Sequence, residues 1–303
     1  MTTQDSLDHV QSLVQQIREE SERQNAEREK ELERAEEQGT AKAAATRDQL
    51  LGLGLSESDL VVDEKQAAAQ QKDIDRLRKE LSKSPGGDDG GFDPSQVDLT
   101  PGSAPEGVRV LRPAFASVLS ATHEQTDARA DAPASDWYYN NTEQNPWVWA
   151  RGAGSGIAGT GVGETSIEVD FWYYFVPTAA RFYGVNPYTY YRGFYIVKSD
   201  DSWYDSHYAR AVVSSHVNVF QYNWKGWNSV NELDVGNDNI NVNQRFDTVR
   251  NHYYSTLLGA NDGAWILNRV KLWVYARGGS AFSQLDFGTG AGNYITAPYV
   301  YVS

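Results

Sequence analysis

Aromatic residues are concentrated in the second half of this chain, and their distribution constrains the fold more than any other feature of the sequence. The 303 residues include 9 Trp, 18 Tyr and 10 Phe, but Phe92 and Phe115 are the only ones that precede Trp137. All the others lie between Trp137 and Tyr301, where they can close a large hydrophobic core and still leave rings on the surface. The sequence therefore predicts two unlike parts: a charged helical N-terminal segment and an aromatic-rich β domain.

Residues 1–83 are predicted to form the helical segment, as two helices with a break near 39–55. The first apolar residues follow the a and d spacing of a coiled coil, but they are too few to establish one: Leu7, Val10, Val14 and Ile17. The second helix begins after Ser56 and has an apolar seam that is one residue wide for most of its length. Because such helices bury too little apolar surface to be stable alone, we expect them to associate with copies of the chain, with each other or with another protein.

Residues 84–107 are rich in Gly, Pro and Asp, which is typical of a flexible linker. From Val108 onward, apolar and polar residues alternate, and clusters of Gly, Asn, Asp and Pro separate the alternating runs. The runs predict seven to nine strands, at residues 108–121, 147–151, 166–176, 188–198, 209–222, 244–257, 264–276, 282–287 and 294–302. This pattern over residues 108–303 indicates an antiparallel β-sandwich or jelly roll.

Charge and composition exclude several classes of function. The formal net charge of −14 opposes binding to phosphate backbones, so we expect no nucleic-acid partner. The absence of cysteine excludes disulfides, thiolate metal sites and a cysteine nucleophile. Apolar runs are too short to span a bilayer as a helix, and residues 1–10 lack the apolar core of a signal peptide. We therefore expect no membrane insertion and no export through a signal peptide.

One pair of carboxylates could support catalysis. Glu168 and Asp170 are two residues apart in the predicted strand at 166–176, so both side chains point to the same face. The pair resembles part of the E-x-D-x-x-E motif of laminarinase-type jelly-roll glucanases, but Tyr173 stands where the final Glu is required. We interpret the pair as polar residues on a solvated strand face and predict that the chain is not an enzyme. A jelly-roll carbohydrate-active enzyme is the alternative.

The stretch from Asp234 to Asn243 is rich in the oxygen ligands that calcium prefers. Its spacing departs from that of a calcium-binding loop, and Asn and Asp are also common in turns. We therefore predict no cofactor, and we regard Asp234 and Asp238 as the candidate ligands in case Ca²⁺ is bound.

Aromatic residues that stand beside polar ones are the candidate binding residues. They occur in predicted loops and strand ends, where rings are difficult to bury, and comprise Trp137, Tyr138, Trp203, Tyr204, Trp224 and Trp227. Exposed Trp and Tyr next to Asn and Asp can stack on sugar faces, hydrogen-bond to hydroxyl groups or form protein interfaces. The alternative is that these rings cap the sandwich ends or pack against neighbouring subunits.

In its organisation the chain resembles the fibres, spikes and adhesion tips of tailed viruses, and trimeric heads of the tumour-necrosis-factor type share the general plan. The resemblance rests on the order of helical segment, linker and β head. It implies a non-enzymatic homo-oligomer, with a trimer favoured, that attaches to a particle or surface protein through residues 1–83. The β head would contact a receptor, a glycan or a protein, with multivalent binding. It also implies a virion or extracellular particle surface after synthesis in the cytoplasm; an assembly component without a receptor role is the alternative.

Overall fold

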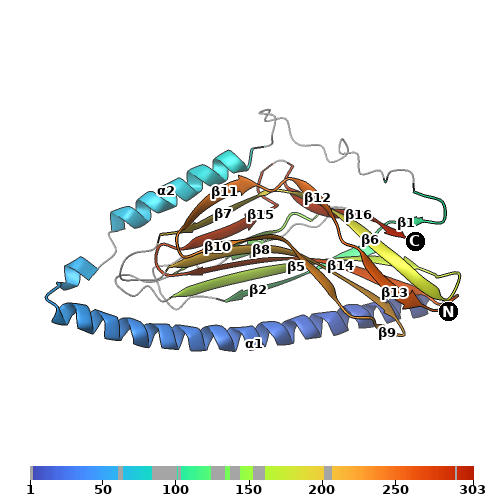
Figure 1. Cartoon of the computed structure of the whole chain (residues 1–303), viewed down its shortest axis with the longest axis horizontal. Coiled ribbons are helices and arrows are strands. Elements are labelled where there is room, and N and C mark those ends of the chain that lie inside the picture. The colour runs from blue at the N-terminus through green and yellow to red at the C-terminus, as the bar shows by residue number, and fades with distance from the viewer. Residues whose placement is uncertain are drawn as a thin grey trace.

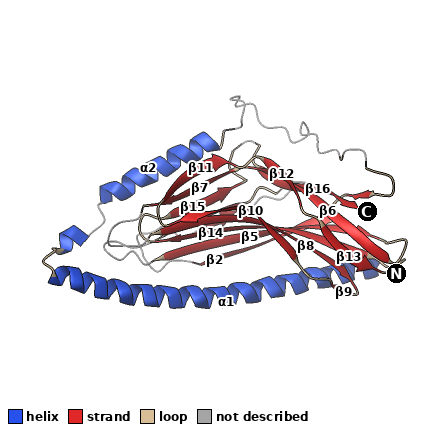
Figure 2. Ribbon diagram, viewed as in Figure 1, coloured by secondary structure: helices blue, strands red, loops and turns tan. Residues whose placement is uncertain are grey.

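The computed structural model describes residues 3–60, 64–83, 101, 104–123, 134–136, 144–152, 161–200, 207–290 and 292–303. Within these residues the chain is an antiparallel β-sandwich with a helix against each of its two outer faces (Figures 1 and 2). Most of the predicted linker at 84–107 lies outside the described residues. No helix in the described part of the chain combines the length and apolarity needed to cross a membrane.

The helical segment has three elements, and the first of them is unusually long. They are α1 (Thr3–Gly52), the short 3₁₀ helix η1 (Glu57–Leu60) and α2 (Glu64–Leu81). At a rise of about 1.5 Å per residue, α1 is roughly 75 Å long. It runs along one face of the sandwich, and the chain then turns so that α2 returns along the opposite face (Figure 1).

Sheet B forms one layer of the sandwich. Its strands follow the order β10-β8-β14-β5-β2, with β9 paired to β8, and every pairing is antiparallel. The bounds are β2 (Phe115–His123), β5 (Val162–Phe175), β8 (Tyr208–Gln221), β9 (Asn223–Trp224), β10 (Asn228–Asn237) and β14 (Ala264–Arg277).

Sheets C and A follow one another along the other layer (Figure 2). Sheet C has the order β11-β7-β15-β4-β3, and sheet A has the order β1-β16-β6-β12 with β13 also paired to β6. In sheet C the bounds are β3 (Ala134–Asp136), β4 (Trp147–Arg151), β7 (Phe194–Ser199), β11 (Ile240–Arg245) and β15 (Phe282–Asp286). In sheet A they are β1 (Arg109–Leu111), β6 (Arg181–Arg192), β12 (Thr248–Asn251), β13 (Tyr254–Leu258) and β16 (Tyr294–Val302).

Gly193 joins the two sheets of this layer, since β6 ends just before it and β7 begins just after it. A Cβ atom at this position would lie 2.3 Å from the backbone oxygen of Asp286. Because that contact is shorter than any tolerated by real side chains, the close approach of β15 requires glycine here.

The main core lies between the layers, and the alternation in the sequence predicts much of it. One face of β5 contributes Ile167, Val169, Phe171, Tyr173 and Phe175, all of which are buried in this core. The last strand, β16, also contributes to the core, and Ser303 hydrogen-bonds through its backbone to Gly184. The predicted antiparallel β-sandwich with an N-terminal helical segment is therefore confirmed.

The helices are docked on the sandwich of the same chain, which the sequence did not predict. Val10, Leu13 and Ile17 of α1 are buried against the outer face of sheet B. Ile74 and Leu77 of α2 are buried against sheet C. Burying an aliphatic side chain of this size contributes roughly 1.5–3 kcal/mol. The apolar residues of both helices thus find their partners within one copy of the chain.

Several element boundaries differ from the prediction, and β10 lies in a stretch where no strand was predicted. The first helix does not end near Gly39 but continues to Gly52, and the turn follows at Leu53, Gly54 and Leu55. A glycine inside a helix costs only about 1 kcal/mol relative to alanine, and the Ala-rich sequence after Gly39 compensates for this.

The predicted strand at 244–257 is divided among β11, β12 and β13, while the predicted strand at 188–198 spans the junction of β6 and β7. Short interruptions that carry a strand from one sheet to the next leave the alternation nearly intact. They are therefore hard to detect in the sequence.

Candidate binding site between helix α1 and sheet B

A row of charged side chains crosses the outer face of sheet B beneath α1. Asp170 of β5 is paired in register with Arg269 of β14, and Glu168 is paired with Lys271. His216 of β8 is opposite Arg269 on its other side. Because directly opposed residues in antiparallel strands project from the same face, the register alone brings these groups together.

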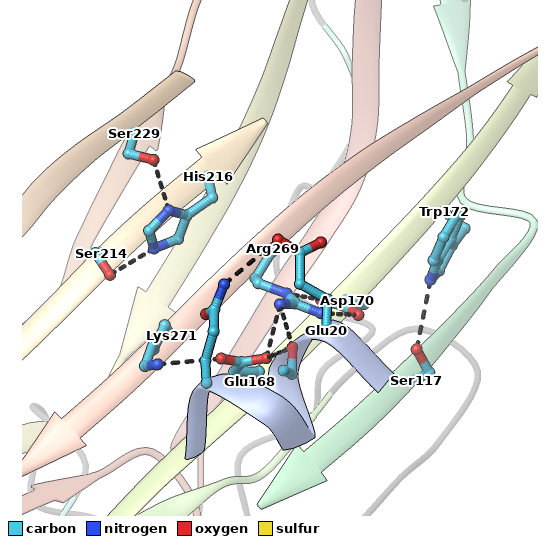
Figure 3. Close-up of polar contacts among 12 residues, drawn as sticks. Glu20, Ser117, Glu168, Asp170, Trp172, Ser214, His216, Ser229, Arg269 and Lys271 are labelled. Carbon is cyan, nitrogen blue, oxygen red and sulfur yellow. Dashed lines mark hydrogen bonds and ion pairs between the residues drawn. The ribbon is translucent and has the colours of Figure 1, made fainter. Parts of the chain in front are cut away.

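Arg269 is the centre of this row, as Figure 3 shows. Its Nε and Nη2 atoms donate to the two carboxylate oxygens of Asp170, at 2.7 and 2.9 Å. Its Nη1 atom lies 2.7 Å from Oε2 of Glu168, whose other oxygen accepts a hydrogen bond from Lys271 at 3.1 Å. Both carboxylates are nearly inaccessible to solvent, so these contacts compensate for their lost hydration.

Ser21 connects α1 to the charged row. Its hydroxyl donates to Oε2 of Glu168 at 2.8 Å and accepts from Nη1 of Arg269 at 2.9 Å. Further along the same helix, Arg28 pairs with Glu164 of β5, with Nη2 and Oε2 3.0 Å apart. The small Ser21 side chain lets the helix backbone come close to the sheet at this point, and it satisfies a carboxylate and a guanidinium at once.

The environment fixes the charge states of Glu168 and His216. Burial by itself would raise the pKa of Glu168, but the positive charges of Arg269 and Lys271 outweigh it, so the net effect lowers the pKa. Burial, together with the same two cations, lowers the pKa of His216 to about 4. His216 is therefore neutral at physiological pH. Its two ring nitrogens lie 2.8 Å from the Ser214 hydroxyl and 2.7 Å from the Ser229 hydroxyl.

A cavity of about 190 Å³ opens beside this row, between α1 and strands β8, β10 and β14. Its walls include Glu20 and Gln24 from the helix and Glu168, Lys271, His216 and Trp227 from the sheet. The Trp227 side chain is 37% exposed. Its ring stands perpendicular to that of His216 at a centroid distance of 6.2 Å, and Cζ of Arg269 lies 5.5 Å from its centroid. The cavity thus combines a flat aromatic wall with hydrogen-bond donors and acceptors.

The structure separates the predicted binding residues into three groups. Trp227 lines the cavity. Trp224 is stacked beside Trp227 but is packed among the residues beneath α1, so it is not a free surface ring. The others, Trp137, Tyr138, Trp203 and Tyr204, lie outside the described residues.

The interpretation of Glu168 and Asp170 as residues of a solvated face was wrong, because α1 covers that face. The side chains project from the same face, as predicted, but both are buried and paired with cations. Glu168 reaches the cavity wall, whereas both oxygens of Asp170 are occupied by Arg269. This arrangement is an ion-pair network, not a pair of carboxylates facing each other across a cleft.

The candidate calcium ligands are also used differently. Asp234 lies in β10, where Nη2 of Arg210 approaches its Oδ2 atom to 2.7 Å. Asp238 lies in the connection to β11, and its backbone N–H is capped by the Asn237 side chain. The Asn- and Asp-rich stretch therefore forms two strands and a turn. Within the described ranges, no three His, Asp or Glu side chains converge in a way that could hold a metal ion.

The sequence pattern did not single out Ser21, His216, Arg269 and Lys271 as site residues. The last two occupy the polar positions of the alternating run at 264–276, so pairing that run with 166–176 in antiparallel register would have placed them beside the carboxylates. Ser21 gives no comparable signal, because it looks like one more polar position in a charged helix.

No protein-family model matches this sequence, and no curated protein matches it. Solved structures give distant similarities. TmCBM61 in complex with beta-1,4-galactotriose is 12% identical, with a TM-score of 0.19 over 65% of this chain and 88% of that one. A family 35 carbohydrate-binding module from Clostridium thermocellum is 9% identical, with a TM-score of 0.18 over 64% and 96% of the two chains.

The enzymatically active domain of tailspike protein 4 from Bacteriophage CBA120 is 7% identical, with a TM-score of 0.17. It matches 73% of this chain but only 21% of its own. Similarity at these scores carries no conclusion about function, and the assignment of the fold rests on the strands described above.

Proposed function

We propose that this chain is a non-enzymatic glycan-binding protein and that the cavity beside Trp227 holds one sugar unit. The observation that carries the proposal is the position of a partly exposed Trp ring at the wall of a polar cavity. A sugar has a flat face of C–H groups and a rim of hydroxyl groups. It is therefore suited to a site that offers one aromatic face and several polar groups at its edge.

The polar groups of the cavity match a hydroxylated, uncharged ligand. Lys271 and the Gln24 amide can donate hydrogen bonds, while Glu20 and Glu168 can accept them. Because the cationic groups are balanced by the carboxylates beside them, the site presents no excess of positive charge to attract an acidic ligand. A neutral sugar would satisfy both the donors and the acceptors.

The test is a comparison of two ring deletions on a glycan array that carries neutral and acidic oligosaccharides. Trp227→Ala should weaken binding to the oligosaccharides that the wild type retains by about tenfold or more, as expected for loss of a stacking ring. Phe182→Ala removes a ring that is 67% exposed on sheet A and should leave binding unchanged. Equal effects of the two variants, or no binding by the wild type, would contradict the proposal.

We propose further that this site binds sugar without cleaving it. A glycosidase requires two carboxyl groups at the scissile bond, one of which donates a proton. Both oxygens of Asp170 are engaged by Arg269, and those of Glu168, which shares the cavity wall with Glu20, are engaged by Arg269 and Lys271. We expect no new reducing ends when the wild type is incubated with the oligosaccharides it binds. Turnover that is abolished by Glu168→Gln would instead favour the jelly-roll carbohydrate-active enzyme.

A further inference from the structure

The exposed ring of Trp227 is the end of a longer aromatic path. It stacks on Trp224 at a centroid distance of 6.5 Å and an interplanar angle of 12°. From Trp224 the contacts continue to Phe220 at 5.4 Å and to Trp172 at 6.1 Å. Trp172 in turn contacts Phe115 at 5.6 Å and Trp265 at 6.5 Å.

These six side chains, which we call the ring row, begin in the connection after β9 and cross sheet B from β9 through β8, β14 and β5 to β2. They are Trp227, Trp224, Phe220, Trp265, Trp172 and Phe115.

The N-terminal part of α1 lies on the ring row and covers it. Val10, Leu13 and Ile17 are buried against Trp172, Trp265 and Leu267. Trp172 is completely inaccessible, whereas Trp227 at the end of the row is 37% exposed. The cover consists of these aliphatic side chains together with His9, whose ring lies 5.4 Å from that of Phe220, so about two turns of one helix are placed on a continuous aromatic surface.

The charged groups beside the ring row are paired within sheet B itself. Arg269 is paired with Asp170, and Lys271 is paired with Glu168, through contacts between β5 and β14 that do not involve the helix. Lifting residues 3–21 of α1 would remove the Ser21 hydrogen bonds, but it would leave these ion pairs in place. The charged groups of this face therefore stay paired when the helix is lifted from it.

We propose that the ring row is an extended glycan-binding surface, continuous with the Trp227 site, and that residues 3–21 of α1 are its internal cover. The inference rests on the proposed function and extends it from a single sugar unit to a longer chain. A short sugar occupies the cavity while α1 is in place, and a longer chain of neutral sugars displaces the helix and stacks on the remaining rings. The apparent affinity for the longer chain is then reduced by the fraction of molecules in which the helix is lifted.

The experiment weakens the contact of α1 with the ring row in the full-length chain. Leu13→Asp combined with Ile17→Asp places charge against the rings, while Ser12→Asp combined with Gln16→Asp adds the same charge, at the same spacing, at exposed positions of the same helix. Disaccharides and hexasaccharides of β-linked glucose, galactose, mannose and xylose are the probes. We expect the first variant to bind hexasaccharides about tenfold more tightly than the control variant. Its affinity for disaccharides should be no higher than that of the control, because Glu20 in the cavity wall belongs to the lifted segment.

Hydrogen exchange in the wild type provides a second measurement that needs no substitution at all. Bound hexasaccharide should accelerate exchange in residues 3–21, whereas bound disaccharide should not. Unchanged or slower exchange with the hexasaccharide would show that residues 3–21 are not a displaceable cover. This outcome holds even if the variant at Leu13 and Ile17 does not fold. The inference fails and the proposed function stands if the wild type binds disaccharides through Trp227 but the variant at Leu13 and Ile17 binds hexasaccharides no more tightly than the control variant does. If no probe binds, both fail.

Discussion

At the scale of single residues, Arg269 determines the charge balance of the outer face of sheet B. It is almost completely buried and is in contact with Asp170, Glu168 and the Ser21 hydroxyl. Its burial disfavours the charged form, but the two carboxylates outweigh this effect and raise its pKa. Arg269 is therefore a permanent cation that pairs with two buried carboxyl groups beneath a helix.

Removing the guanidinium should be costly for this reason. Arg269→Met leaves Asp170 and Glu168 buried with fewer partners, and we expect a loss of about 3–5 kcal/mol in the free energy of unfolding. Arg210→Met removes an ion pair with Asp234 at the surface and should cost no more than about 1 kcal/mol. Urea denaturation measures both. Similar losses for the two variants would show that the buried ion pairs of Arg269 stabilise the fold no more than a surface ion pair does.

His216 should make the stability depend on pH. In the unfolded chain its pKa is near 6.5, whereas in the folded chain it is about 4. Between these values the unfolded state binds the proton more readily. The contribution of neutral His216 to the free energy of unfolding is therefore complete above pH 6.5 and is lost as the pH falls toward 4. The groups that act on the imidazole are Arg269, Lys271, Glu168 and His252.

We expect a loss on the order of 2–3 kcal/mol between pH 7 and pH 4 that is attributable to His216. Urea unfolding of the wild type and of His216→Gln at both pH values isolates this group, because the other titrating residues are common to the two proteins. An equally steep pH dependence in the variant would exclude His216 as its source.

At the scale of elements, the two helices are held by different surfaces. α1 lies on the aromatic and charged face of sheet B, whereas α2 places Ile74 and Leu77 on Phe194, Ile196 and Phe282 of sheet C. The contact of α2 also includes the ion pair between Asp73 and Lys198 and a hydrogen bond from Arg78 to Gln284. Both helices thus depend on tertiary contacts, as expected for charged helices with narrow apolar seams.

Ile74 is the side chain on which the docking of α2 depends most, since it is completely buried. Ile74→Ala should reduce the free energy of unfolding by about 2–5 kcal/mol, while Lys79→Ala at an exposed position of the same helix should be nearly neutral. Thermal or urea denaturation measures the difference. A loss below about 1 kcal/mol for Ile74→Ala would mean that α2 is not stably docked in solution.

The sequence predicts elements of this fold better than it predicts their partners. The alternation from Ile167 to Phe175 identifies a strand and its core face, because side chains on a strand alternate strictly. The docking of α1 is not predictable in the same way, since Ser21 meets residues 147 and 248 positions away. The site was predicted in part: Trp227 and the shared face of Glu168 and Asp170 follow from local pattern, but the cavity exists only where the helix crosses the sheet.

At the scale of the whole molecule, the two helices enclose the sandwich between them (Figure 1). The sequence suggested that residues 1–83 are free to assemble with copies or to attach to a particle. In the structure Val10, Leu13, Ile17, Ile74 and Leu77 are buried on the chain's own sheets. Homo-oligomerisation and attachment to a particle stay predictions, but they would need surfaces other than these apolar residues.

Light scattering tests this point directly. If the helices hold no second copy, the molar mass of the wild type and of the Leu13→Asp and Ile17→Asp double variant should be the same, whatever that mass is. A wild-type oligomer that dissociates in the double variant would restore the helical segment as the assembly element.

The position of α1 has a consequence for the order in which the protein is made. This helix leaves the ribosome before the strands that it contacts, β5 and β14, which end at residues 175 and 277. Until the last of them has been synthesised, Leu13 and Ile17 have no surface on which to pack, and the helix is only marginally stable. The helix α1 is therefore translated before β5 and β14 but can dock only after both have been made, and the nascent chain exposes its ring row until that happens.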